Sequence, residues 1–223
     1  MLAIMSTASA PITFAPPALW AMARTFLVTF FALFGSPQQL AEKHTLTGKA
    51  YKLTLDWLRA GEALLRRLLL IEAAHYDKPN LRPLLHERRA RVRRAITFYP
   101  DQPEAWRVSF RMFVTSRRAP RPPLAKRPEK PRLSREERWC SEHWPRPTFH
   151  SAWSLAERVE AMLRVFNNPE PYAKRLARRL HATPHRARAL LRHPANAPGL
   201  IGSESFAATA APCDEARRRF EPG

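Results

Sequence analysis

Side chains that could bind a metal are concentrated between Cys140 and His150. Cys140 and His143 are separated by two residues, and His150 follows at a short distance. This is the spacing of half a tetrahedral zinc site, which needs four ligands, usually as two close pairs. The second pair is missing, because Cys213 is the other cysteine of the chain and stands alone. The sequence therefore predicts no bound metal and no cofactor.

No catalytic motif appears in the sequence. It has no glycine-rich phosphate loop, no G-x-S-x-G, no H-E-x-x-H and no repeated D-x-D. Glu62 and Glu72 could be pictured as di-iron ligands, but no Glu-x-x-His pair accompanies them. They are better explained as solvated charges on a helix. We therefore expect that the protein is not an enzyme.

The segment RLARRLHATPHRARALL, residues 175–191, pairs two short helices around a tight turn. It resembles a helix-turn-helix unit at Leu176, Ala177, Leu180 and Leu190. The resemblance implies that His185, Arg186 and Arg188 begin a recognition helix, where side chains reach base edges. His181, however, stands where the motif usually has glycine. The alternative, which the sequence favours, is an arginine-coated helical hairpin that packs locally.

The strongest positive charge lies in the middle of the chain. Residues 79–135 carry 16 basic and 4 acidic side chains, net +12, out of a net charge of +19 for the whole chain. Such a segment is attracted to anionic lipid, nucleic acid or an acidic protein surface. The residues expected to contact an anionic surface are Arg88, Arg89, Arg91, Arg93 and Arg94. Arginine outnumbers lysine 31 to 7, so part of this charge can reflect GC-rich codon usage.

The element that must position these groups is a helix centred on residues 46–71. Apolar residues recur there at intervals of three and four, which places them on one helix face. They are Leu46, Ala50, Leu53, Trp57, Ala60, Leu64, Leu68 and Ile71, widened by Leu58, Leu65 and Leu69. The polar side carries Lys49, Lys52, Arg59 and Arg66. Ser36 and Gln39 form a capping box, so we expect amphipathic helix over residues 37–76, either as one long helix or as two helices bent near Gly61.

The apolar run at residues 18–34 has three interpretations. As a membrane-spanning helix it would be short and would carry Arg24 within the bilayer. As a signal peptide that starts at Met22 it lacks a good cleavage site. As a buried helix it would pack on the amphipathic face described above. Membrane association and a buried helical hairpin are the two main expectations.

The period of the sequence changes after residue 95. Ile96 and Phe98 alternate with polar residues, and after Pro103 the alternation resumes. Its second half comprises Trp106, Val108, Phe110 and Met112 on one side and Arg107, Ser109 and Arg111 on the other. This pattern predicts a β-hairpin with one arginine-bearing face. Arginine beside aromatic residues is also the composition of a platform for single-stranded nucleic acid, although alternation alone favours a strand.

Together these patterns predict a mainly α protein. An N-terminal apolar helix and one long amphipathic helix precede a basic, proline-rich, partly disordered middle with the hairpin, and a small three-helix bundle follows at 155–167, 169–182 and 184–193. The expected divisions are a disordered N-terminus at 1–17, a helical region at 18–78, a basic arm and linker at 79–153, the bundle at 154–194 and a flexible tail at 195–223.

The expected function is that of a non-enzymatic, membrane-associated interaction protein of bacterial type. Its partner would be an anionic membrane surface or an acidic protein, at the cytoplasmic face of a membrane or in the cytoplasm. The alternative is a DNA-binding protein that reads through residues 169–193. A dimer through the long helix is the oligomer that this helix could support.

Overall fold

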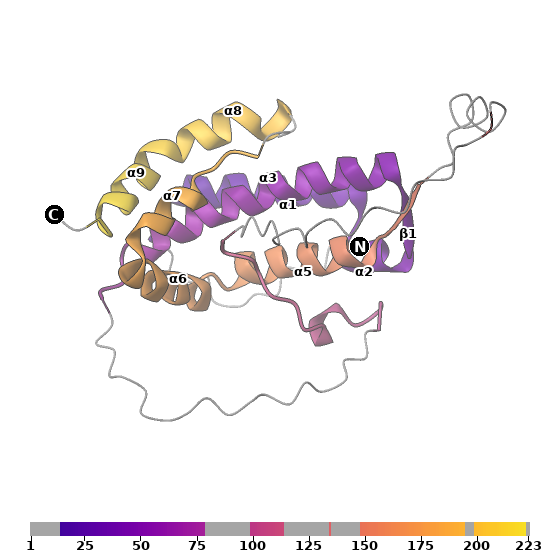
Figure 1. Ribbon diagram of the computed structural model, residues 1–223, viewed down its shortest axis with the longest axis horizontal. Coiled ribbons are helices and arrows are strands. Elements are labelled where there is room, and N and C mark those ends of the chain that lie inside the picture. The colour runs from indigo at the N-terminus through magenta and orange to yellow at the C-terminus, as the bar shows by residue number, and fades with distance from the viewer. Residues whose placement is uncertain (1–13, 79–98, 114–133, 135–147, 195–198, 222–223) are drawn as a thin grey trace.

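The computed structural model describes residues 14–78, 99–113, 134, 148–194 and 199–221. Within these ranges the protein is mainly α-helical, with a small two-stranded sheet (Figure 1). The α-helices are α1 (Pro17–Phe34), α2 (Pro37–Glu42), α3 (Gly48–Ala73), α5 (Trp153–Asn167), α6 (Glu170–Ala182), α7 (Ala187–Leu190), α8 (Gly199–Ala208) and α9 (Ala210–Arg218). The 3₁₀ helices are η1 (Pro103–Ala105) and η2 (Pro184–Arg186), and the strands are β1 (Thr45–Thr47) and β2 (Phe149–Ser151).

The predicted N-terminal apolar helix is confirmed as α1. It ends at Gly35, whose φ of +94° is a conformation that glycine adopts without strain. Ser36 and Gln39 then form the expected capping box and start α2. One face of α1 is buried, namely Leu19, Ala23, Phe26, Leu27 and Phe30. The helix therefore packs on the rest of the protein by a single stripe of side chains.

The chain turns sharply between α2 and α3, so residues 37–76 do not form one long helix, and the break does not lie near Gly61 as the alternative predicted. His44 adopts a left-handed φ of +51°. Two β-branched threonines follow it, Thr45 and Thr47, and they lie in strand β1. The Thr47 side chain then accepts a hydrogen bond from the Ala50 amide and caps α3. The periodic pattern continues through this turn, so periodicity alone did not reveal the break.

Helix α3 is the centre of the fold. Every residue from Ala60 to Ala73 is buried, so the second half of the helix is covered on all sides. Figure 1 shows α8 and α9 on one side of it and α5 and α6 on the other, and α1 also packs against it. Leu53, on the predicted apolar face, is instead 56% exposed.

Gly61 allows α1 and α3 to approach closely. A Cβ atom at this position would lie 2.2 Å from the Phe26 ring, well inside van der Waals contact. The same Phe26 ring stacks on Trp57, with centroids 6.2 Å apart. The aromatic side chains of α1 therefore rest directly on the α3 backbone.

The sheet joins segments that are far apart in sequence. β1 and β2 are antiparallel, with Thr45 opposite Ser151 and Thr47 opposite Phe149. The Ala152 amide also donates to the His44 carbonyl at 2.8 Å. This short pairing ties the start of α3 to the start of α5.

The hairpin predicted around residue 100 is not formed by the residues that the structure describes there. Residues 106–112 contain no strand, although their alternation is real: Trp106 and Met112 are buried while Arg107 and Arg111 are exposed. Trp106 packs on Trp153, with ring centroids 4.9 Å apart. The segment thus lays its apolar side on the helices instead of pairing with a second strand. Residues 96–98, the other predicted strand, lie outside the described residues.

The C-terminal helices share one core with α1 and α3. The predicted helices at 155–167 and 169–182 correspond to α5 and α6, and the third is reduced to η2 and the four-residue α7. Both α5 and α6 pack directly on α3. One buried apolar cluster includes residues from both ends of the described chain, from Ala15 to Phe220. The sequence placed these helices in a bundle of their own. Their apolar stripes are instead the cover that the all-round apolar α3 requires.

The tail, expected to be flexible, contains α8 and α9. Five residues spaced by three and four positions face inward, which is the pattern of an amphipathic helix. They are Phe206, Thr209, Cys213, Ala216 and Phe220, and each is at most 5% exposed. The abundance of alanine obscured this stripe in the sequence.

Candidate functional site

The residues predicted to read DNA lie on η2 and α7. The turn is built as expected, since the Thr183 amide donates to the Arg179 carbonyl at the end of α6. Arg186 lies over the Phe113 ring at 5.6 Å, and Arg188 is 3.7 Å from Glu221. His185 is exposed. A recognition helix, however, would have to be formed by α7, whose four residues span about 6 Å.

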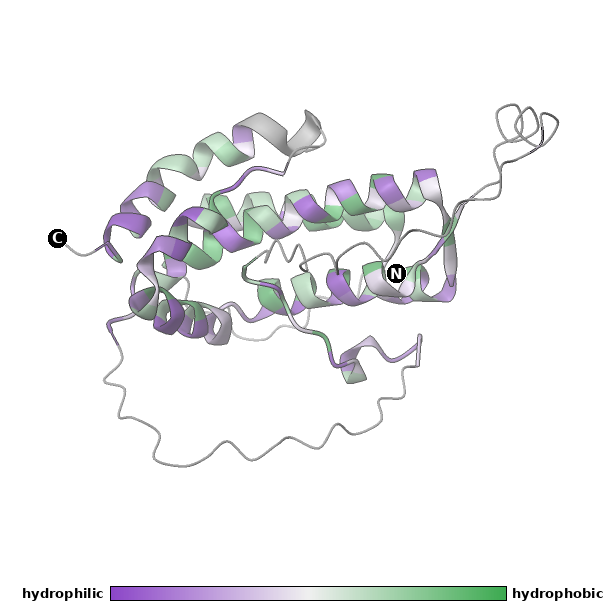
Figure 2. Ribbon diagram, viewed as in Figure 1, coloured by the Kyte–Doolittle hydropathy of each residue, from purple (hydrophilic) through white to green (hydrophobic). Residues whose placement is uncertain are grey.

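A band of basic side chains follows the outer face of α6. Lys174, Arg175, Arg178 and Arg179 are all exposed. Lys174 pairs with Glu170, and this hydrogen bond, followed by the charge of the carboxylate, raises the pKa of the lysine. Figure 2 shows hydrophilic residues along α6 and at the end of α9. The arginines expected to contact an anionic surface, Arg88 to Arg94, lie outside the described residues.

Buried charge on α3 is the feature that sequence reasoning missed. Glu62, Arg66, Arg67 and Glu72 are each no more than 7% exposed. Arg66 was assigned to the polar side of the helix, and that assignment is wrong because α5 and residues 106–113 cover it. The spacing of Glu62 and Arg66 signals an ordinary helix ion pair. Only the covering segments, distant in sequence, convert it into a buried one.

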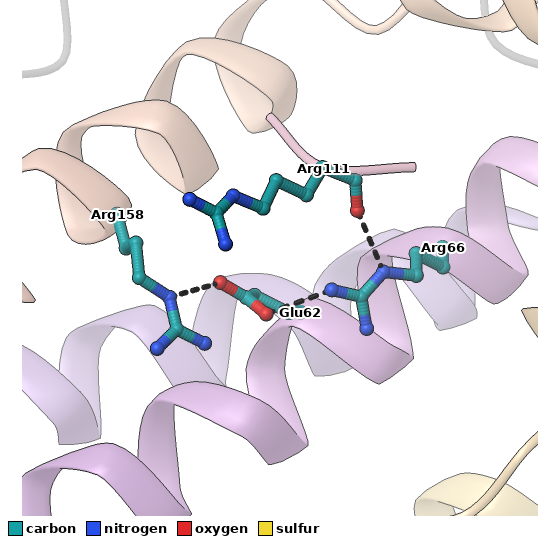
Figure 3. Close-up of polar contacts among 4 residues, drawn as sticks. All are labelled: Glu62, Arg66, Arg111 and Arg158. Carbon is teal, nitrogen blue, oxygen red and sulfur yellow. Dashed lines mark hydrogen bonds and ion pairs between the residues drawn. The ribbon is translucent and has the colours of Figure 1, made fainter. Parts of the chain in front are cut away.

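Glu62 holds two arginines from different elements (Figure 3). One carboxylate oxygen accepts from Arg66 Nη2 at 2.7 Å, and the other accepts from Arg158 Nε on α5 at 2.8 Å. Arg66 Nε in turn donates to the Arg111 carbonyl at 3.0 Å. Burial lowers the pKa of Arg66, and the Glu62 carboxylate opposes that shift. The cluster therefore fastens α5 and residues 106–113 to α3.

Arg67 is a buried cation without a carboxylate within ion-pair distance among the described residues. Nη1 donates to the Phe206 carbonyl at 2.9 Å and to Thr209 Oγ1 at 3.0 Å, while Nη2 donates to the Leu191 carbonyl at 2.8 Å. Nη2 also meets His193 Nε2 at 3.1 Å, and Nε is buried with no partner among the described residues. Burial lowers the pKa of Arg67.

A cavity of about 280 Å³ opens beside this arginine. Its lining includes Arg67, His193, Phe206, Cys213 and Asp214. Burial lowers the pKa of His193, and so does the charge of Arg67. Burial also raises the pKa of the Cys213 thiol to about 12, which keeps it protonated and unreactive at neutral pH. The cavity is thus lined by a positively charged side chain, the guanidinium group of Arg67, and its cysteine is not an activated nucleophile.

Glu72 anchors the start of the described chain. Its carboxylate accepts hydrogen bonds from the amides of Phe14 and Ala15, at 2.8 and 3.0 Å, and from Trp20 Nε1 at 3.0 Å. These three donors are neutral, and they replace the water that the buried carboxylate has lost. Both glutamates pictured as di-iron ligands are therefore fully engaged in structural contacts.

Of the side chains with zinc-like spacing, Cys140 and His143 lie outside the described residues. The ring of the third, His150, stacks on Tyr51 with centroids 4.6 Å apart. The part of the chain that the structure describes contains no group of three or more side chains able to hold a metal ion.

The outward side of α1 exposes large apolar side chains. Val28 is 55% exposed and Leu33 57% exposed. The hydroxyls of Thr25 and Thr29 donate to the carbonyls of Ala21 and Thr25, so they no longer need water as an acceptor. By length and composition alone, the stretch Pro17–Glu42, which comprises α1 and α2, is apolar enough to cross a membrane, and 28% of its most apolar 18-residue window is buried within the protein.

Comparisons with known proteins add no relative, because no family model, curated protein or solved structure matches this chain.

Proposed function

We propose that this protein is a non-enzymatic interaction protein that lies on an anionic membrane surface through the outward face of α1. The observation that carries the proposal is the composition of that face. Arg24 is the charged residue of α1, and the exposed side chains include Val28 and Leu33. Exposing an apolar helix face of this kind to water is unfavourable. Burying it at the boundary between the lipid headgroups and the acyl chains lowers the free energy.

The packing of α1 favours a helix in the plane of the membrane over one that spans it. A spanning helix would have to leave α3 and uncover the apolar side chains of α3 that α1 now covers, such as Trp57 beneath Phe26. Exposing a single large apolar side chain to water costs about 1.5–3 kcal/mol, so uncovering this whole face of α3 would be costly. With the inner face on α3, the outer face can rest on lipid without any change of fold.

Basic side chains near the end of α1 suit an anionic leaflet. Lys43 Nζ donates to the Phe34 carbonyl at 3.2 Å, at the end of the apolar helix. Lys49 and Lys52 are exposed on the first turns of α3, where Leu53 is also exposed. Juxtamembrane lysine and arginine residues each contribute about 1 kcal/mol of attraction to anionic lipid. The expected location is therefore the cytoplasmic face of a membrane.

The proposal is tested by co-sedimentation of the full chain with phosphatidylcholine vesicles that contain or lack phosphatidylglycerol. The double variant Val28→Ser/Leu33→Ser removes two exposed apolar side chains without changing the charge, and we expect at least about a tenfold loss of vesicle affinity. Tyr99→Ser is the matched control, because Tyr99 is equally exposed but does not belong to α1. Equal vesicle binding by the double variant and the unaltered protein would reject the proposal.

DNA binding is the second candidate, favoured by the exposed arginines of α6. Arg178 and Arg179 have no carboxylate partner among the described residues. Binding through several phosphate contacts would fall steeply with salt concentration. Arg178→Ala and Arg179→Ala should then weaken duplex DNA binding, measured by fluorescence anisotropy, and so should Arg186→Ala and Arg188→Ala after the turn that follows α6. If the chain does not bind DNA at low salt, this candidate is excluded.

A further inference from the structure

The arginines around Glu62 carry more positive charge than the cluster can neutralise. Glu62 contributes one negative charge, whereas Arg66, Arg111 and Arg158 contribute three positive charges, which leaves +2. Both carboxylate oxygens are already occupied by Arg66 and Arg158. Figure 3 shows the Arg111 side chain extending across the view toward Arg158. No further carboxylate pairs with these groups among the described residues.

Two of these guanidinium groups, those of Arg111 and Arg158, have N–H donors that no described residue accepts. Arg158 uses Nε to reach Glu62, so both of its Nη groups remain without a partner among the described residues, and its side chain is 29% exposed. Arg111 is exposed, and the hydrogen bond that it makes with Arg66 uses its backbone carbonyl and not its side chain. Because Glu62 holds the Arg158 Nε in place, less side-chain entropy is lost when Arg158 binds a ligand.

We propose that Arg111 and Arg158 form a binding site for a phosphate group. Guanidinium groups bind phosphate through paired charge-assisted hydrogen bonds, and a dianionic phosphate matches the excess of two positive charges. The phosphate could belong to a lipid headgroup or to a soluble phosphate ester. The site is separate from the outward face of α1, so the two proposals can fail independently.

The probe is pyrophosphate, titrated into the full chain at constant ionic strength and followed by calorimetry. Arg111→Ala removes an exposed guanidinium and keeps the carbonyl that Arg66 needs, and we expect about a tenfold or greater loss of pyrophosphate affinity. Arg107→Ala is the matched control, since Arg107 is exposed on the same segment and carries the same charge. It should change the affinity by less than about twofold.

Two further variants make the result decisive. Arg158→Lys keeps the charge but loses the planar fork, and it should also weaken pyrophosphate binding. The double variant Val28→Ser/Leu33→Ser should bind pyrophosphate normally, even if it no longer binds vesicles. Weaker binding of Arg111→Ala to vesicles that carry phosphatidic acid, whose headgroup is a phosphate monoester, would assign the phosphate to a lipid headgroup. Unchanged binding to these vesicles would assign it to a soluble ester. The absence of saturable pyrophosphate binding, or equal losses for Arg107→Ala and Arg111→Ala, would overturn the site.

Discussion

Arg66 and Arg67 are consecutive on α3, yet they are buried in different chemical surroundings. Arg66 pairs with the Glu62 carboxylate, whereas Arg67 depends on two backbone carbonyls, the Thr209 hydroxyl and the His193 ring. An arginine only donates hydrogen bonds, so His193 Nε2 must be unprotonated to accept. His193, which follows α7, therefore contacts α3 as a neutral histidine.

The Arg67–His193 contact predicts a loss of stability in mild acid. The pKa of His193 is lowered from 6.5 by burial and by Arg67, with Asp214 and Cys213 of α9 also lining this cavity. A histidine whose folded pKa lies below its unfolded pKa stabilises the protein fully above the unfolded pKa. That contribution is lost as the pH falls from 6.5 through the lowered pKa.

Urea denaturation at a series of pH values measures this effect. His193→Gln keeps an acceptor without a titrating group, so its free energy of unfolding should depend less on pH between about 5 and 7 than that of the unaltered protein. Identical pH dependence in the two proteins would show that the contact with Arg67 does not control the titration of His193.

At the scale of elements, the arrangement is set by how closely each helix approaches α3. Gly61 permits the contact of α1 with α3, and the stripe from Phe206 to Phe220 seats α8 and α9. Both features appear modest in the sequence. From the sequence alone, a glycine within a helix indicates only a small loss of helix stability, and an alanine-rich tail indicates a frayed chain end.

Gly61→Ala should destabilise the protein, although the same change in an exposed helix is stabilising. The new methyl group would lie 2.2 Å from the Phe26 ring, and overpacking of this kind costs about 1–3 kcal/mol. Chemical denaturation gives the free energy of unfolding. In a Phe26→Ala background the cost of Gly61→Ala should largely disappear, and a cost that persists there would contradict the close contact.

Phe220→Ala should lower the free energy of unfolding by about 3 kcal/mol, because Phe220 is 5% exposed and packs on His181. The exposed residue Arg218, two positions away, supplies the control variant Arg218→Ala, which should have little effect. The measurement is again chemical denaturation. Equal stability of both variants would mean that α9 does not pack as described.

At the scale of the molecule, a single apolar cluster joins the N-terminal and C-terminal helices. α1, α5, α6 and α9 all pack on α3, and the pairing of β1 with β2 closes one end. The buried charges of α3 reinforce this arrangement. Glu72 secures the N-terminal segment, Glu62 secures α5, and Arg67 secures the region of α8 and α9.

A shared core predicts a single cooperative unfolding transition. Leu58→Ala on α3 and Leu176→Ala on α6 both remove fully buried side chains, and each should cost about 2–5 kcal/mol. Scanning calorimetry should show both variants shifting the same transition. Two separable transitions, each moved by one variant alone, would indicate that the C-terminal helices fold independently of α3.

The local elements were determined by the sequence itself. The apolar run gave α1, Ser36 and Gln39 gave the start of α2, and the apolar periods gave most of α3, α5 and α6. Local signals suffice there, because capping and helical periodicity depend on neighbours within a few residues. The alternation of residues 106–112 was also correct as a pattern of burial, although not as a hairpin.

Only the tertiary structure decided which surfaces are covered and which remain open. The sequence indicates that Arg66 is a solvated charge, but in the structure the Arg111 carbonyl accepts a hydrogen bond from Arg66 and Arg158 pairs with Glu62, and both groups come from segments far along the chain. The break at His44 depends on β2, roughly a hundred residues away, and the exposed face of α1 depends on how much of it α3 covers. Burial is a property of contacts between distant segments, so the candidate binding surfaces became visible only once the helices were placed together.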